Sequence, residues 1–570
     1  MNSSFWFRKS PLLCGVMVVV VAAQVCVGAD NAERAAILKL VPADVAVALV
    51  ATNLQQTDKA LAAMVKGIDS EAKDVNLLAG IKSELEIGDW VDFSKPFAMI
   101  QPDANSGDAG LFFAYVPDFD AKIKVLEGAA KKDGVWEISK KVAAGEPAKP
   151  SFYLLRQGKV VAGASARKFL DLVGKGPDLG SALSVQPKDI AGRDFLVHIN
   201  MSPLRDKVVG AISMYGPMMA MMAGAQAGGG DPAALTGMIN AMVEGVLGFV
   251  KQLATLDVAV DFSVDGVGVT VASRFTDGAI KAYLARQKPA SLPLLATVPD
   301  QPYTMAFGFH MPGEDSGLMA YLMEKMLAAL PKKPAAEGGA EAGADDVNAK
   351  ALTNIKAFYG KLEGFNAVVH VSDSGLSEVG DLTGSDVQDL LERGKDLLEH
   401  SSELMAAFGM GASGYTSLGK KQFGKTQADL YRFEMDPNNP AAAQATAMMG
   451  EDTQFALGID SGRLRFGFGS EADLKRAFSP VTGKSLAASK YAKAAMGALP
   501  KHSNLVVLID PAGILSMVAT FAPMPVASIP PCEPFALSVS LAGEPARLDV
   551  HVPARSIREL MKAFEPDEPM

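Results

Sequence analysis

The sequence predicts an α+β fold with antiparallel sheets, helices packed on one face, and internally duplicated segments. A strand–helix–hairpin unit recurs three times along the chain. Its hairpins alternate apolar and polar residues with a period of two, and each turns at a glycine-containing segment. The regular strand–helix alternation typical of a doubly wound parallel sheet is absent, and adjacent hairpins favour antiparallel pairing.

Each copy of the unit opens with an apolar strand that ends on a capping residue or proline. Ser202-Pro203 ends the first strand, and Asp510-Pro511 ends the third. Serine and aspartate accept hydrogen bonds from the N–H groups at a helix start, and proline fits the first helical position. The opening segments are 195–203, 305–316 and 505–511, and the apolar helices that follow are expected to start at Leu204, Leu318 and Ala512.

Each copy continues with a hairpin and closes with an amphipathic helix. The hairpin strands are expected at 256–262 with 267–275, at 365–371 with 376–382, and at 535–541 with 546–552. The closing helices are expected at 279–285, 387–398 and 556–564. Asp510 is explained as a cap of this unit, and no catalytic role is needed for it.

A second element, a hairpin that leads into a serine-capped helix, occurs at 152–172 and again at 455–478. Together with the repeated unit it predicts two related α+β halves, 31–292 and 293–570. The stretch 331–346 has too little apolar surface to pack and is expected to be a disordered loop within the second half.

The first residues, 1–29, have the order of a secretory signal peptide. Arg8 and Lys9 precede an apolar run over 12–21, and Val27-Gly28-Ala29 is a small-residue cleavage site. The apolar run is too short for a stable transmembrane span. We therefore expect a periplasmic or extracellular protein after cleavage near Ala29.

Charge and cysteine content exclude several classes of function. Removal of the two basic residues of the signal takes the formal charge from −10 to −12, which argues against nucleic acid or an anionic membrane as partner. Only Cys532 would remain, so no intrachain disulfide can form. The six histidines form no metal-binding pair at close spacing, and we expect no cofactor.

One segment matches the phosphate-binding loop of nucleotide hydrolases, G-x-x-x-x-G-K-[ST]. It begins at Gly419 and ends with Gly424, Lys425 and Thr426. Such a loop needs a buried strand before it and a helix after it, whereas the residues before it are polar and 427–433 alternates like a strand. A chance match is favoured, and a nucleotide-binding enzyme is kept as the alternative.

A methionine-rich stretch is the most specific candidate for a binding site in the sequence. The segment 208–230 carries no charge, and its centre contains Met214, Met218, Met219, Met221 and Met222. A buried helix is the simplest interpretation, because methionine fills irregular gaps in protein cores. A transmembrane helix and a copper site are weaker alternatives. The remaining hypothesis is an adaptable apolar surface that contacts a ligand or an envelope protein.

Short segments resemble exported proteins of unknown function from planctomycete-type bacteria. They are Val41-Pro42-Ala43-Asp44 before a strand, Asp89-Trp90 before Pro96-Phe97, and the ending 548–553. The resemblance implies an envelope or extracellular location and no known activity, and no functional residue is carried over.

No catalytic residues are predicted, and the expected function is non-enzymatic binding of an apolar ligand or protein partner outside the cytoplasm. The alternatives are the nucleotide-binding enzyme and a purely structural component of the envelope.

Overall fold

The structure is a computed structural model, and it forms two compact units. It describes residues 31–68, 76–85, 87–104, 110–139, 150–184, 193–225, 232–263, 265–288, 294–310, 353–372, 375–402, 414–434, 449–450, 452–479, 485–521 and 527–564. Unit 1 contains the described residues within Met1–Asp206, Leu253–Thr276 and Pro545–Arg558. Unit 2 contains those within Lys207–Gln252, Asp277–Glu544 and Glu559–Met570.

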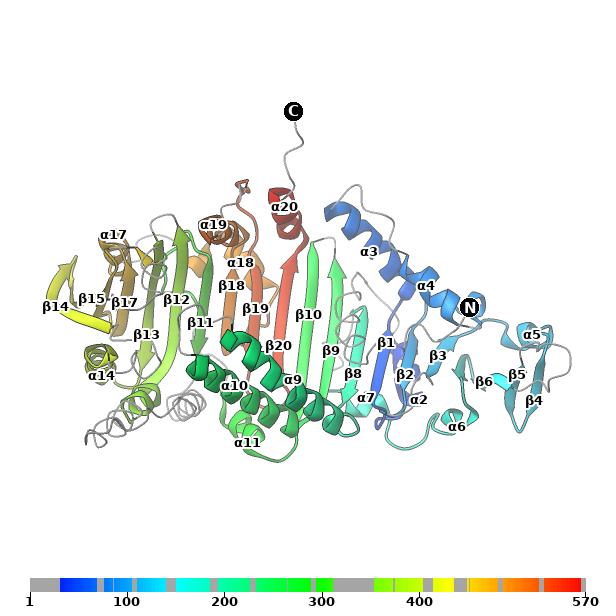
Figure 1. The fold of residues 1–570 in the computed structure, drawn as a ribbon. Helices are drawn as coiled ribbons and strands as arrows, with labels where there is room; N and C mark the ends of the chain where they lie inside the picture. Colours follow the sequence, from blue (N-terminus) through cyan, green and yellow to red (C-terminus); the bar gives the residue numbers. More distant parts are fainter. Residues whose placement is uncertain are drawn as a thin grey trace. The chain divides into compact units, whose positions relative to one another are not determined.

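Unit 1 is an antiparallel sheet with helices (Figure 1). Its strands pair in the order β20-β10-β9-β8-β1-β2-β3-β7-β6-β5-β4. The strands are β1 (Val47–Ala51), β2 (Phe97–Gln101), β3 (Leu111–Tyr115), β4 (Ala129–Lys132), β5 (Val135–Ser139), β6 (Pro150–Gln157), β7 (Val160–Ala164), β8 (Phe195–Asn200), β9 (Leu253–Ser263), β10 (Gly266–Phe275) and β20 (Ala546–Pro553). The helices include α2 (Asn31–Leu40), α3 (Leu54–Ile68), α4 (Leu77–Glu84), α5 (Phe119–Lys124), α6 (Arg167–Leu170) and α7 (Leu179–Ala182).

Unit 2 also contains an antiparallel sheet, with strand order β19-β18-β11-β12-β13-β17-β16-β15-β14. Its strands are β11 (Met305–His310), β12 (Leu362–Ser372), β13 (Gly375–Gly384), β14 (Gly414–Phe423), β15 (Thr426–Glu434), β16 (Gln454–Asp460), β17 (Arg463–Gly469), β18 (Leu505–Ile509) and β19 (Phe535–Ser540). Its helices include α10 (Pro232–Gln252), α11 (Ala279–Arg286), α14 (Val387–Glu399), α17 (Glu471–Ala477), α18 (Lys490–Gly497) and α19 (Pro511–Phe521), while α9 (Arg205–Ala225) and α20 (Ala554–Phe564) begin in unit 1.

The two sheets share one pattern of strand pairing. Strands β1 to β9 follow the order β9-β8-β1-β2-β3-β7-β6-β5-β4, and adding ten to every number gives the order in unit 2. The two isolated bridges also correspond. Pro42, which precedes β1, pairs with Asp178, and Pro299, which precedes β11, pairs with Ser485. The units do not coincide with the expected halves 31–292 and 293–570, because β20 near the C terminus pairs with β10.

The mixed α+β fold with antiparallel sheets is confirmed, but the expectation that helices cover only one face is wrong. Neighbouring residues on a strand point to opposite faces. Leu196 packs in the cluster that contains Ile37 of α2, whereas Val197 packs in the cluster that contains Leu61 of α3. Unit 2 behaves likewise: α17 packs against one face of its sheet and α14 against the other. Strands such as β3 and β7, buried at every position, have no solvent-facing side.

The strands and the closing helices expected from the repeated unit are present. The helices α11, α14 and α20 close the three copies, and α9 and α19 follow the opening strands of the first and third. The expected helix start at Leu318 and the loop 331–346 lie outside the described residues. In the described part of the chain, no helix is long and apolar enough to cross a membrane.

A further copy of the unit was missed at the N-terminal end. Strand β1 leads into α3, where Asn53 Oδ1 accepts a hydrogen bond from Gln56 N at 2.9 Å, and the paired strands β2 and β3 precede α5. In the sequence, this copy is indicated by an apolar segment that ends before Asn53, because asparagine is a favoured helix-capping residue. Nine residues separate β2 from β3, so no tight hairpin turn marks this pair of strands in the sequence.

Candidate functional site

The residues of the phosphate-loop match lie in a β-hairpin. Phe423 pairs with Thr426, so Gly424 and Lys425 alone form the turn between β14 and β15. Gly424 has φ +59°, the left-handed conformation that glycine adopts without steric cost. The strand expected over 427–433 is confirmed, and it occupies the place where a phosphate-binding loop needs a helix. This hairpin therefore offers no helix N-terminus to a nucleotide.

The methionine-rich stretch lies in α9, and its described side chains contradict the expectation of a buried helix. Met214 and Met218 are 63% and 50% exposed. The side chains of Met219, Met221 and Met222 lie outside the description of the structure. Three further large apolar residues, which the sequence analysis did not select, are exposed on the same two helices: Tyr215 on α9 at 50%, and Val246 and Phe249 on α10 at 49% and 43%.

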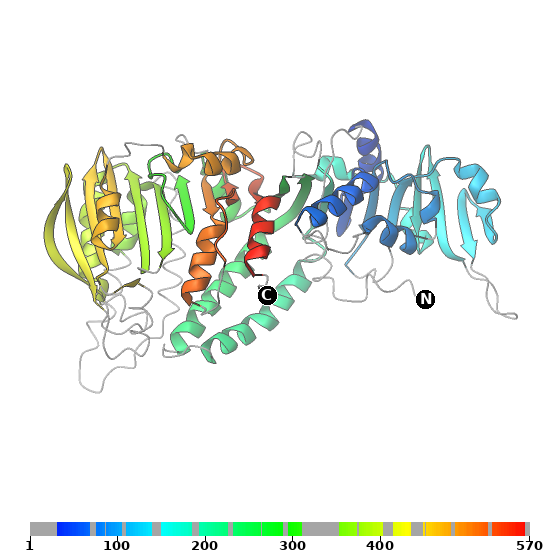
Figure 2. The ribbon, with the colours of Figure 1, turned by 90° about the horizontal axis from the view of Figure 1, so that it is seen from above.

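The helices α9 and α10 contact each other closely near their middles (Figure 2). A Cβ added to Gly216 would lie 2.7 Å from Val243 Cγ1, so any larger residue at this position would force Val243 to move. Six residues separate the two helices in the sequence, and helices joined by so short a connection run antiparallel. Gly216 and Val243 therefore mark the line along which the two helices meet.

Helical geometry places three of the exposed apolar residues on one side of this pair. At about 100° per residue, Tyr215 lies about 100° from Gly216, while Val246 and Phe249 lie about 60° and 120° from Val243 in the same rotational sense. A local two-fold axis, perpendicular to the plane of the two helices, relates the members of an antiparallel pair. Residues rotated by similar angles in the same sense from the contact line therefore lie on the same side of that plane. Tyr215, Val246 and Phe249 form what we call the apolar face.

Charged residues of α10 lie on the opposite side of the pair. Glu244 and Lys251 are both exposed, and they lie about 100° and 80° from Val243 in the other rotational sense. The helix pair is thus amphipathic across its width, with charges on one side and aromatic and aliphatic side chains on the other. Such an uncharged exposed surface is typical of a binding site for an apolar partner.

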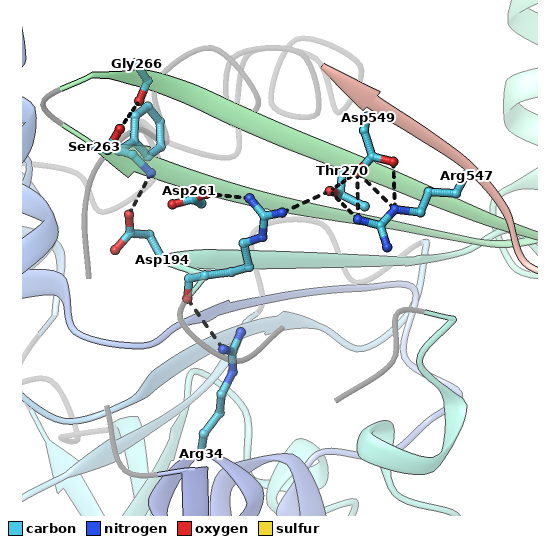
Figure 3. A network of polar contacts seen from close by, with 10 residues as sticks. Arg34, Asp194, Asp261, Ser263, Gly266, Thr270, Arg547 and Asp549 are labelled. Carbon is cyan, nitrogen blue, oxygen red and sulfur yellow. Dashed lines mark hydrogen bonds and ion pairs between the residues drawn. The ribbon is translucent and has the colours of Figure 1, made fainter. Parts of the chain in front are cut away.

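A buried polar network lies at the start of β8 in unit 1 (Figure 3). The fully buried carboxylate of Asp194 accepts hydrogen bonds from Phe262 N at 3.1 Å and Thr57 Oγ1 at 3.3 Å. Its neighbour Arg193 donates to Asp261 Oδ2 on β9 at 2.5 Å. Burial lowers the pKa of Arg34 to about 10, against the opposing attraction of Asp194. The network joins α2, α3, β8 and β9.

The network extends along the sheet to the C-terminal strand. Arg193 Nη2 donates to Thr270 Oγ1 on β10 at 3.4 Å, and Thr270 donates to Asp549 Oδ1 on β20 at 2.6 Å. Arg547 donates to both oxygens of Asp549, at 2.9 Å and 2.7 Å. The carboxylates are therefore engaged by protein donors, and this arrangement holds strands together rather than presenting a reactive group.

His198 and Asp257 form a second buried polar pair across β8 and β9. Both side chains are fully buried, and His198 Nδ1 lies 2.6 Å from Asp257 Oδ1. The other carboxylate oxygen accepts a hydrogen bond from Ser184 N. A His–Asp pair could orient a nucleophilic serine, but Ser184 Oγ lies 2.9 Å from Thr255 Oγ1 instead. Neither His198 nor Asp257 is in contact with solvent, which favours a structural role for this pair.

Unit 2 carries half-buried titratable side chains around β13. Burial raises the pKa of Glu378, and burial together with the charge of Glu378 raises the pKa of Tyr415 to about 12. Burial and the charge of Arg476 lower the pKa of His370, and the charge of Asp473 opposes them. Within the described residues, no group of three or more His, Cys, Asp or Glu side chains could hold a metal ion.

Comparisons with protein-family models, curated proteins and solved structures gave no match to this chain.

Replacement of Asp257 by alanine should destabilise the protein by about 3 kcal/mol, because it leaves His198 and Ser184 N buried without their shared acceptor. The measurement is urea unfolding of the protein, followed by circular dichroism. Asp120→Ala, which removes an exposed carboxylate of the same unit, is the control and should change the unfolding midpoint little. Equal effects of the two substitutions would contradict the structural role of the buried pair.

Glu378→Gln should stabilise the protein more at pH 7 than at pH 4. Because burial raises the pKa of Glu378 in the folded state, ionisation opposes folding, and the wild-type protein loses stability as pH rises through the interval above the ordinary value of 4.5. The glutamine variant does not titrate there. Unfolding free energies at both pH values test this, with Glu392→Gln on α14 as control for the loss of one negative charge. A difference between variant and wild type that is equal at the two pH values would contradict it.

Millimolar ATP with Mg²⁺ should not raise the melting temperature, since Gly424 and Lys425 form a tight turn without a following helix. Differential scanning fluorimetry is the measurement. A nucleotide-dependent rise that disappears in Lys425→Ala would restore the nucleotide-binding alternative.

Proposed function

We propose that this protein is an exported, non-catalytic binding protein of the envelope or extracellular space, and that the apolar face of α9 and α10 contacts an apolar ligand or a protein partner. The observation that carries the proposal is the segregation of side chains on the helix pair. Tyr215, Val246 and Phe249 share one side, while Glu244 and Lys251 occupy the other. Isolated exposed apolar residues are common on proteins, but a grouped uncharged face on paired helices favours a binding role.

The chemistry of the face fits an apolar partner better than a charged one. Aromatic side chains supply large contact areas at low cost in conformational entropy, and the flexible thioether of the exposed Met218, on the same side of α9 as Tyr215, adapts to irregular surfaces. Each apolar side chain of this size gains on the order of 1.5–3 kcal/mol when it is fully buried. Because these residues are already partly covered, the gain on binding is smaller, but several act together.

We also propose that the chain arose by internal duplication, in halves close to 31–292 and 293–570. The support is the identical pairing order of β1 to β9 and β11 to β19, including the insertion of four strands after the third strand of each set. The inserted strands that lie at the edge of each sheet match as well. Both β4 and β14 carry a pair of adjacent lysines, Lys131-Lys132 and Lys420-Lys421.

Export is proposed from the arrangement of residues 1–29, and the resemblance to exported planctomycete-type proteins agrees with it. Mass spectrometry of the protein from the periplasm or medium should give a chain that begins at Asp30. Recovery of the uncleaved chain from the cytoplasm alone would overturn this part of the proposal.

The binding role predicts a localised loss of hydrophobic-dye fluorescence. Met218→Ser combined with Phe249→Ser should lower the fluorescence of a bound dye by about half, because both residues lie at the exposed apolar surface of the helix pair. The matched control is Leu418→Ser combined with Met561→Ser, which removes two apolar residues of similar exposure elsewhere. No dye binding by the wild-type protein, or an equal loss in the control, would contradict the proposed site.

A further inference from the structure

We infer that the partner of the apolar face is a second copy of this chain, so that the α9–α10 pairs of two molecules form a four-helix bundle about a two-fold axis. This inference rests on the proposed binding function and names the occupant of the same face. It starts from the architecture of the helix pair. Two antiparallel helices form a single layer, and an apolar side of such a layer is stabilised when another layer packs on it.

The distribution of charge favours a self-contact. A two-fold axis brings the same patch of each molecule together, so any charge on the face would meet its own copy and repel it. The face avoids this, because Glu244 and Lys251 lie on the other side of the pair and α9 carries no charged residue after Lys207. The segregation removes the main obstacle to like-with-like association of a chain whose mature net charge is −12, two below the −10 of the full sequence.

The size of the helix pair reaches what a specific dimer needs. Each helix has 21 residues. This corresponds to a length of about 32 Å, and two helices side by side are about 20 Å wide. One face therefore measures roughly 600 Å², and a dimer would bury roughly 1,200 Å² in total, at the lower limit of stable specific interfaces. We expect a reversible dimer with a dissociation constant in the micromolar range, about −8 kcal/mol of binding free energy.

Ionic strength provides a signature that separates this contact from one held by ion pairs. Two molecules of charge −12 repel each other at long range, and salt screens that repulsion. Association through an uncharged face should therefore strengthen between low and high salt. A partner held by complementary charges would dissociate under the same change.

The test is sedimentation equilibrium of the whole chain without residues 1–29. The protein concentration is varied over about 1–100 µM, a range that spans the expected dissociation constant. The wild-type protein should pass from monomer to dimer in this range, and the dimer fraction should rise with salt. Val246→Glu and Tyr215→Glu should each weaken dimerisation at least about tenfold, because each places a charge against its own copy. The matched control, Asn240→Glu, adds the same charge about 60° from Val243 on the charged side and should leave the dissociation constant within about twofold.

Two outcomes would overturn the inference: a wild-type protein that stays monomeric at 100 µM, or a dimer that Val246→Glu and Tyr215→Glu leave intact. The same variants in the dye-binding experiment distinguish this failure from failure of the proposed function. A monomer whose dye binding still depends on Phe249 would keep the apolar binding role and exclude the second copy as partner. A monomeric protein that binds no dye would contradict both the apolar binding role and the second copy as its partner.

Discussion

The packing of unit 1 depends on one constraint: the buried carboxylate of Asp194 and its neighbour Arg193 must be hydrogen-bonded within the protein. A carboxylate without contact to water must be met by donors, and Asp194 finds them in Thr57 of α3 and Phe262 N of β9. The carbonyl of Arg193 accepts from Thr52 Oγ1 at the end of β1, at 2.7 Å. Elements that are far apart in the sequence therefore meet at one residue pair, and the cost of leaving a buried charge unpaired fixes their relative positions within the unit.

Extension of this network explains why the segment Pro545–Arg558, which contains β20, belongs to unit 1. Thr270 receives a hydrogen bond from Arg193 and donates one to Asp549, so the polar contacts run from β8 to β20 in the same direction as the strand pairing. At the other end of the pairing order, β4 carries Lys131 and Lys132, and β14 in unit 2 carries Lys420 and Lys421 beside a bulge. Lysines and bulges discourage the addition of further strands, so the edges formed by β4 and β14 are poorly suited to partner binding.

The apolar helix pair contrasts with these surfaces. The buried carboxylates of Asp194 and Asp257 are matched by donors within the protein, and the edge strands β4 and β14 carry lysines. On α10 the exposed charges of Glu244 and Lys251 instead lie on one side of the helix pair, and Tyr215, Val246 and Phe249 occupy the other. An acidic protein gains solubility from its net charge, and it can then expose a small apolar face without general aggregation. The apolar face is consequently where function is best sought.

The sequence by itself determined the local structure of this protein, because strand alternation, helix caps and turns depend on neighbouring residues. The strands and closing helices of the repeated unit, the capping place of Asp510 and the absence of a helix after Gly424-Lys425 were all accessible to it. It also identified Met214 and Met218, but not whether they are exposed. Only the tertiary structure decided that helices cover both faces of the sheets, that Asp194 and Asp257 are buried with partners more than 50 residues away, and that Phe249 shares a face with Tyr215. These features depend on which elements meet in space, and no local pattern encodes that.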